Sequence, residues 1–173
     1  MPHRWKPNVT VAALIEREGR FLLVEEHTAD GLRLNNPAGH LDPGESLVQA
    51  CVRETLEETA YAFRPEGLVG IYLSAAQPGG AAMPADVAQA NGPRTRPTYL
   101  RFAFCGELGQ FDPGRALDQG IVRTLWLGVD EIRASRQLHR SALLLQGVED
   151  YLAGIRHPLS LLSTEGIAGI TRS

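Results

Sequence analysis

The sequence predicts an α+β sandwich, in which strands and helices pack in layers around one core. Short segments of alternating apolar and polar residues, typical of strands, are interleaved with two or three segments whose apolar residues recur at helical spacing. The chain has 173 residues, of which 43% are hydrophobic and 21% are charged. This length and composition are typical of one globular domain, spanning residues 1–173, that buries about 70% of the surface exposed by its unfolded chain.

A β-hairpin is expected near the N-terminus. In the stretch NVTVAALIEREGRFLLVEEHT, apolar residues alternate over residues 9–15 and 20–25, and Gly19 lies between the two segments. The following segment, 29–46, is expected to be mostly loop with a short strand at 32–34. It is punctuated by Gly31, Pro37, Gly39, Pro43 and Gly44.

A helix is predicted from Ser46 to about Ala60. Ser46 suits the N-cap position, and Gln49 three residues later completes a capping box. Six residues at helical spacing form a stripe that is expected to pack on the sheet, namely Val48, Cys51, Val52, Thr55, Leu56 and Thr59. The charged residues of the helix lie outside this stripe, so its acidic face is expected to point elsewhere.

The second half of the chain predicts three more strands and two helices. The strands are expected at 68–73, 99–107 and 122–127, followed by a short helix from Asp130 and a longer one, capped by Ser141 and ending near Gly154. Residues 74–97 are poor in large apolar residues and rich in Ala, Gly and Pro. They are interpreted as a flexible insert that is either disordered or a binding lid.

Composition excludes several classes of protein. The longest apolar runs, such as VAALI and ALLL, are far shorter than the roughly 20 residues of a membrane span, and the first residues lack an apolar signal core. Cys51 and Cys105 lie in apolar contexts and are interpreted as buried free thiols. The net charge of −3 argues against a nucleic-acid-coating surface. We therefore expect a cytoplasmic protein with no membrane or nucleic-acid partner. If its ligand is anionic, a metal ion is expected to lie between the ligand and the protein.

Three glutamates crowd one face of the predicted helix, because Glu54, Glu57 and Glu58 fall at positions i, i+3 and i+4. On a solvated helix such like-charge contacts cost only about 0.2–0.5 kcal/mol each. In a cleft with an effective dielectric constant near 20, the repulsion would reach about 3 kcal/mol per pair, which a bound cation or a raised pKa would have to relieve.

The wider pattern around these glutamates resembles the Nudix box, the signature of the Nudix hydrolases. The pattern covers residues 39–61, and its matching residues are Gly39, Glu45, Arg53, Glu54, Glu57 and Glu58. Flanking segments from about Lys6 to Leu159 resemble a bacterial phosphatase branch of the family, whereas the insert before Arg96 does not. The resemblance implies a Nudix-type α/β/α sandwich with a mixed β-sheet.

Three residues depart from the usual box. Thr55 and Tyr61 occupy positions where aliphatic residues are common, and Ala60 replaces the late glycine. If the chain turns at Ala60 in the left-handed conformation, the alanine costs about 1–2 kcal/mol there. The alternative is that the helix continues past this position.

The resemblance also implies roles for the box residues. Glu57 and Glu58 would bind Mg²⁺, for which Mn²⁺ could substitute, and Glu54 would be a metal ligand or the general base. Arg53 would hold the catalytic glutamates in place without touching the substrate. Gly39 and Glu45 would support the loop, and the Ala38 carbonyl would complete the metal shell. This set suits phosphoanhydride hydrolysis, which requires charge neutralisation and a water held in line.

Other readings of these residues stay open at this point. Arg53 and Glu57 could form an ordinary surface ion pair, and Gly39 could be a simple turn residue. His40 is expected to be structural or to line the pocket, because no second histidine lies at ligand spacing. Asp118 could be an auxiliary carboxylate or a solvated loop residue. Three arginines could meet phosphates or face solvent, namely Arg101, Arg123 and Arg140.

The family resemblance implies an Mg²⁺-dependent hydrolase of phosphoanhydride bonds that acts as a monomer or homodimer on a small phosphorylated substrate. The implied substrates are nucleoside tri- and diphosphates and thiamine-pathway diphosphates, with release of orthophosphate. One alternative is a pyrophosphatase for nucleotide sugars, dinucleotides or oxidised nucleotides. Another is a Nudix-like module that senses a nucleotide without hydrolysing it, although a sensor has no need of all three glutamates.

Overall fold

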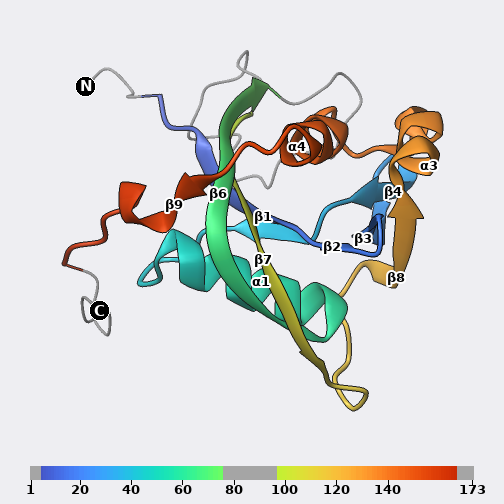
Figure 1. Cartoon of the computed structure of the whole chain (residues 1–173), viewed down its shortest axis with the longest axis horizontal. Helices are drawn as coiled ribbons and strands as arrows, with labels where there is room; N and C mark the ends of the chain where they lie inside the picture. The colour runs from blue at the N-terminus through green and yellow to red at the C-terminus, as the bar shows by residue number, and fades with distance from the viewer. Residues whose placement is uncertain (1–4, 76–96, 167–173) are drawn as a thin grey trace.

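Two β-sheets with helices on both sides make up the computed structural model, which describes residues 5–75 and 97–166 (Figure 1). The first sheet has the strand order β5 (Ala38–His40), β1 (Asn8–Leu14), β7 (Thr98–Phe111), β6 (Tyr61–Ala75) and β9 (His157–Pro158). The second contains β2 (Glu16–Arg17), β3 (Arg20–Thr28), β4 (Gly31–Asn35) and β8 (Ile121–Gly128). Most of the predicted insert, residues 76–96, lies outside the described residues.

The pairing of β1 with β7 is parallel, whereas the other named strand pairs are antiparallel. The first sheet is therefore mixed, as the sequence predicted. All the strands predicted from alternation are present, and β6 and β7 extend several residues beyond the predicted bounds.

The predicted N-terminal hairpin is wrong in its pairing. Only the short β2 forms a hairpin with β3, with Glu18 and Gly19 at positive φ in the turn. β1 itself leaves for the other sheet, where it lies between β5 and β7. The reason is that β1 is buried and finds partners distant in sequence, which alternation alone cannot indicate.

Helix α1 (Leu47–Thr59) begins as predicted. The Ser46 hydroxyl accepts a hydrogen bond from the Gln49 N–H at 3.1 Å, and the Gln49 side chain accepts one from the Ser46 N–H at 2.9 Å. At the other end Ala60 adopts φ 59° and ψ 13°, so the chain turns there in the left-handed conformation and the helix does not continue.

The buried face of α1 is rotated relative to the predicted stripe. Its buried residues include Ala50, Cys51, Thr55 and Thr59, but also Glu58, which is only 8% exposed. Val48, Val52 and Leu56 are only half-buried. The acidic face therefore does not point wholly away from the protein, because one of its carboxylates enters the interior.

The two sides of the first sheet carry separate apolar clusters. Along β1, alternate residues point to opposite sides. Val11 and Ala13 join the cluster under α1, whereas Ala12 and Leu14 join the cluster under the C-terminal helices. Figure 1 shows α1 on one side of the sheet and α4 on the other. This layering confirms the predicted α/β/α sandwich.

The C-terminal helices are α3 (Val129–Ala134) and α4 (Leu143–Leu152), with two short 3-10 turns, η1 (Arg136–Leu138) and η2 (Leu159–Leu161). The predicted cap of α4 is wrong by one residue. Ala142 is its N-cap and makes no side-chain hydrogen bond, while the Ser141 hydroxyl is buried without a partner.

Cys51 and Cys105 are free and buried, as predicted. In residues 5–75 and 97–166, every helix is too short or too polar to span a lipid bilayer.

Candidate active site

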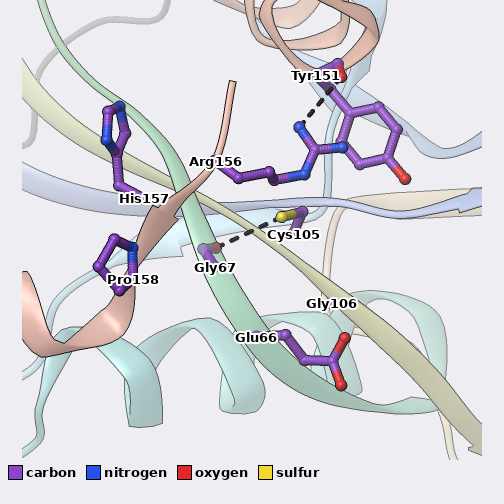
Figure 2. A pocket seen from close by; sticks show the side chains of 8 residues that line it. All are labelled: Glu66, Gly67, Cys105, Gly106, Tyr151, Arg156, His157 and Pro158. Atoms are coloured by element: carbon purple, nitrogen blue, oxygen red, sulfur yellow. Dashed lines mark hydrogen bonds between the residues drawn. The ribbon is translucent and has the colours of Figure 1, made fainter. Parts of the chain in front are cut away.

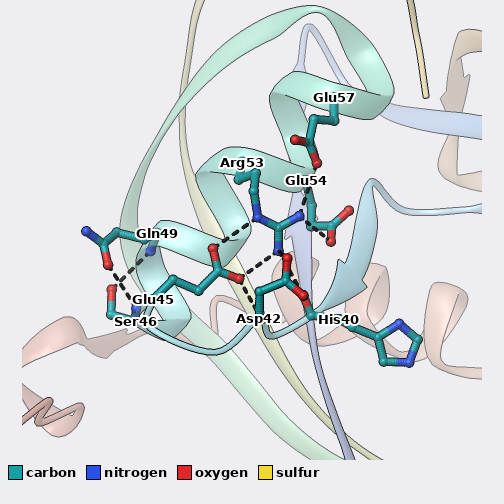
Figure 3. A network of polar contacts seen from close by, with 8 residues as sticks. All are labelled: His40, Asp42, Glu45, Ser46, Gln49, Arg53, Glu54 and Glu57. Atoms are coloured by element: carbon teal, nitrogen blue, oxygen red, sulfur yellow. Dashed lines mark hydrogen bonds and ion pairs between the residues drawn. The ribbon is translucent and has the colours of Figure 1, made fainter. Parts of the chain in front are cut away.

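The Arg53 guanidinium is the centre of a polar network that joins α1 to the loop before it (Figure 3). It donates to both carboxylate oxygens of Glu45, at 3.0 and 2.6 Å. Its Nη1 donates to Glu54 at 2.7 Å and to Glu57 at 3.0 Å. Its Nη2 also donates to the His40 carbonyl at 2.9 Å. One cation thus holds three carboxylates and a backbone carbonyl, which is far more than a surface ion pair.

Strand β5 brings the start of the box close to α1. The register of β1 with β5 places Val11 opposite Gly39. A Cβ atom at Gly39 would lie 2.0 Å from the Cδ of Glu54, so only glycine lets the strand approach this carboxylate so closely. Glu45 fixes the connecting loop because it also accepts a hydrogen bond from the Asp42 N–H at 2.8 Å.

Glu58 reaches the edge of the first sheet. Its Oε2 accepts a hydrogen bond from the Ala38 N–H at 2.8 Å, and β5, which contains Ala38, is the edge strand. Burial raises the pKa of Glu58 to about 8, and the negative charges of Glu26 and Glu54 add to this effect. Without a cation, Glu58 therefore holds a proton near neutral pH.

Glu54 is also held in an unfavourable environment for a negative charge. Burial raises its pKa, Arg53 opposes this rise, and the charges of Glu57 and Asp118 reinforce it. Asp118 lies in the exposed loop between β7 and β8, and its N–H donates to the Glu57 carbonyl at 2.9 Å. The structure thus places this predicted auxiliary carboxylate next to the end of α1.

The donor set suits a hard divalent cation such as Mg²⁺, which prefers carboxylate and carbonyl oxygens. The raised pKa values of Glu54 and Glu58 are those of carboxylates short of positive charge, which a cation would supply. In the described ranges, however, the structure contains no group of three or more His, Cys, Asp or Glu side chains arranged to hold a metal ion. Glu57 accepts a hydrogen bond from Arg53, and Glu58 accepts one from the Ala38 N–H, each through Oε2.

The remaining candidate residues separate into distinct environments. His40 points away from the Arg53 network in Figure 3, and burial lowers its pKa. Arg123 is exposed and pairs with Glu25 at 2.8 Å. Arg140 pairs with the buried Glu26. The three predicted arginines are therefore not equivalent.

Arg101 differs from both of these arginines. Its Nε and Nη1 are shielded from solvent, and neither has a hydrogen-bond partner among the described residues. Burial lowers the pKa of Arg101 to about 10, with a further lowering by Arg140, so it still carries a charge at neutral pH.

Glu26 is the residue of this region that the sequence did not single out. It is 6% exposed, and its charge raises the pKa of Glu58. The register of β3 with β8 shifts between Glu25 and Glu26. Two adjacent glutamates at the end of an apolar strand were the only available signal.

A separate hollow of about 380 Å³ lies between β6, β7 and the C-terminal segment (Figure 2). The Arg156 guanidinium stacks there 3.7 Å from the centre of the Tyr151 ring. Glu66 is the only carboxylate in its lining, so the hollow lacks the grouped carboxylates of the box.

Comparisons with known proteins agree with this geometry. Residues 5–146 match the NUDIX domain family. The chain is 36% identical over 159 residues to Phosphatase NudJ of Escherichia coli K12, covering 91% of this chain and 92% of the relative, and the same values hold for Phosphatase NudJ of Shigella flexneri.

Solved structures also resemble this chain. A NUDIX hydrolase from Nitrosomonas europaea is 49% identical, with a TM-score of 0.78 over 92% of this chain and 97% of that chain. The MutT protein from Methanosarcina mazei Go1 has a TM-score of 0.61 at 21% identity, over 86% of this chain and 96% of that chain, and so shares the fold.

Proposed function

This chain belongs to the Nudix hydrolase family, and on that premise we propose that it hydrolyses phosphoanhydride bonds of small phosphorylated molecules with Mg²⁺ as its cofactor. The observation that carries the proposal is the arrangement around Arg53, which gathers Glu45, Glu54 and Glu57 while Glu58 lies beside Ala38. An acidic helix face that merely points to solvent would not be hydrogen-bonded to the preceding loop in this way.

The box residues would hold the metal. Glu57 and Glu58 would be its carboxylate ligands, Glu54 a further ligand or the general base, and the Ala38 carbonyl a neutral ligand. When bound, Mg²⁺ or Mn²⁺ would supply positive charge against the phosphate oxygens and lower the pKa of a coordinated water. Arg53 would keep Glu54 and Glu57 aimed at the cation, as partners of metal ligands do in other sites.

Glu54 is the residue of this group best suited to move a proton. Burial raises its pKa, which makes it a stronger base than an exposed glutamate. Asp118, whose charge contributes to that rise, would support Glu54 from the neighbouring loop.

The substrates would be nucleoside tri- and diphosphates and thiamine-pathway diphosphates, cleaved at the terminal phosphate. The similarity to a protein named a phosphatase supports orthophosphate as the product. The alternative is cleavage within a nucleotide sugar, dinucleotide or oxidised nucleotide, which the same box could perform. We further propose that the protein is cytoplasmic, acts as a monomer or homodimer and binds neither nucleic acid nor membranes.

A panel of phosphorylated metabolites, assayed separately for phosphate and pyrophosphate, tests this proposal. We expect orthophosphate release from di- and triphosphates with Mg²⁺, loss of turnover in EDTA, and recovery with Mg²⁺ or Mn²⁺. Pyrophosphate as the main product would favour the alternative. Undiminished turnover in chelator would exclude the metal mechanism.

A further inference from the structure

A row of polar side chains crosses the first sheet beside the box. In the strand registers, Thr10 of β1 lies opposite both His40 of β5 and Arg101 of β7, and Arg101 lies opposite Tyr72 of β6. Paired residues of neighbouring strands place their side chains on the same face. Ala103, two residues after Arg101, belongs to the apolar cluster under α4, so the row lies on that side of the sheet.

Several buried polar atoms around this row have no partner. Besides the two nitrogens of Arg101, they include the Thr10 hydroxyl, one carboxylate oxygen of Glu26 and the Ser141 hydroxyl next to Arg140. Thr10 is 5% exposed and Glu26 is 6% exposed. Buried polar groups in native proteins are nearly always hydrogen-bonded. The unpaired nitrogens of Arg101, together with the unpaired hydroxyl of its cross-strand neighbour Thr10, therefore indicate that a polar ligand or water completes them.

Two nitrogens of the Arg101 guanidinium stay unpaired although acidic side chains act on it. The charges that act on it are those of Arg140, Glu26 and Glu58. Arg140 takes one oxygen of Glu26, and the Ala38 N–H takes one oxygen of Glu58. The Arg101 guanidinium thus feels the charges of Glu26 and of Glu58 from the box, yet it has no ion pair of its own in the described part of the chain.

We propose that Arg101 binds a phosphate group of the substrate directly, on the side of the site opposite α1, and so contributes to specificity for substrates with two or more linked phosphates. This inference rests on the proposed function, because it assumes that the box holds the metal-bound part of the same substrate. A guanidinium presents a planar set of donors that matches phosphate oxygens. Because the charge of Glu58 acts on Arg101, one diphosphate could span the metal and Arg101.

Binding of imidodiphosphate, a diphosphate that resists hydrolysis and has no base or sugar, tests the proposal by calorimetry in the presence of Mg²⁺. Compared with the wild type, Arg101→Gln should weaken binding by roughly 10- to 100-fold, as expected for loss of hydrogen bonds to a charged group. Arg101→Lys should give a smaller loss, because it keeps the charge but not the planar donors. Arg123→Gln is the matched control, since Arg123 is an exposed strand arginine paired with Glu25, and it should bind as the wild type does.

Two further measurements separate this proposal from the proposed function. Mg²⁺ alone should raise the melting temperature of Arg101→Gln as much as that of the wild type, which also shows that the variant is folded. In turnover, KM should rise by a similar factor while kcat changes less. If the wild type hydrolyses nucleotides but Arg101→Gln binds imidodiphosphate as tightly as the wild type does, the role of Arg101 is overturned. The proposed hydrolase function would then still stand. A wild type that is stabilised by Mg²⁺ but does not bind imidodiphosphate would overturn the role of Arg101 too.

Discussion

At the scale of single residues, the function depends on how negative charge is distributed between Arg53 and the interior. Arg53 donates hydrogen bonds to Glu45, Glu54 and Glu57, and the bond to Glu45 lowers its pKa. Glu58 has no such cation in direct contact among the described residues, and the Ala38 N–H and, to a smaller extent, the charge of Arg140 offset its burial. Carboxylates of α1 therefore lie close together but in different environments, with Glu54 and Glu57 beside Arg53 and Glu58 in the interior.

The first prediction concerns the proposed metal ligands. Glu57→Gln keeps the shape of the side chain but removes a charge, and we expect kcat to fall by roughly 100-fold or more, as for loss of other well-placed electrostatic groups. The stabilisation by Mg²⁺, seen as a rise in melting temperature, should also shrink. Glu149→Gln on α4, where the glutamate is exposed and pairs with Arg133, is the control and should retain both properties. Wild-type turnover in Glu57→Gln would mean that this face of α1 is merely solvated.

The second prediction concerns pH and the metal-free protein. The pKa of Glu58 is about 8 in the folded protein and near 4.5 when unfolded, so the folded state binds the proton more tightly. This proton therefore contributes to the free energy of unfolding. Its contribution, on the order of a few kcal/mol, is fully present below pH 4.5 and is lost as the pH rises through 8. Urea unfolding in EDTA at pH 5 and pH 8 measures this. Relative to the wild type, Glu58→Gln should gain stability at the higher pH, and an equal difference at both values would contradict the assignment.

At this scale the sequence predicted contacts that are local and missed those that are not. The Arg53–Glu57 ion pair follows from i, i+4 spacing on one helix. The burial of Glu26 and the free donors of Arg101 depend on strands brought together from distant segments, so no local pattern contains them. The sequence could place Arg101 on a strand but could not choose between solvent and ligand.

At the scale of elements, the sequence predicted the start of helix α1 but left its end open. The capping box uses only Ser46 and Gln49, which are neighbours in the chain. Its C-terminal turn at Ala60 was left open by the sequence, because both a strained turn and a longer helix were compatible with alanine. The start of β6 at Tyr61 resolves this, since the strand requires the chain to turn at once.

The third prediction follows from this turn. In Ala60→Gly, relief of left-handed strain by about 1–2 kcal/mol should exceed the loss of one buried methyl group, worth about 0.8 kcal/mol. We therefore expect the free energy of unfolding to rise by roughly 0.5–1 kcal/mol, measured by denaturant titration. Ala50→Gly, in the buried interior of the same helix, should instead lose at least about 1 kcal/mol. Destabilisation by both substitutions to the same extent would show that Ala60 is not strained.

At the scale of the whole molecule, one sheet supports two apolar clusters, and the cluster under α4 sets the position of the segment that carries Arg140. Leu144 is fully buried in that cluster. The fourth prediction is that Leu144→Ala lowers the free energy of unfolding by about 2–5 kcal/mol. Leu161→Ala, where the side chain is 63% exposed, should change it by less than about 0.5 kcal/mol. Similar losses in thermal or urea unfolding would mean that the C-terminal 3-10 turn is packed as tightly as α4.

The sequence predicted the layers of this molecule better than the strand partners. Helical and strand periodicities, together with the box, indicated the sandwich, but pairing depends on which strand edges meet after the chain has collapsed. The assignment of β1 to a hairpin failed for this reason, because β1 lies beside β7, which comes much later in the sequence.

The parallel pairing of β1 with β7 also affects the order in which the chain can fold during synthesis. Asn8 faces Tyr99 across this pair, so the centre of the first sheet cannot close until the ribosome has released more than half of the chain. Until then the buried residues of β1 present an unpaired apolar edge, which invites association with other chains. Contacts this distant in sequence slow folding. Helix α1 is also synthesised before β7, so it could form well before the sheet that supports β5 is complete.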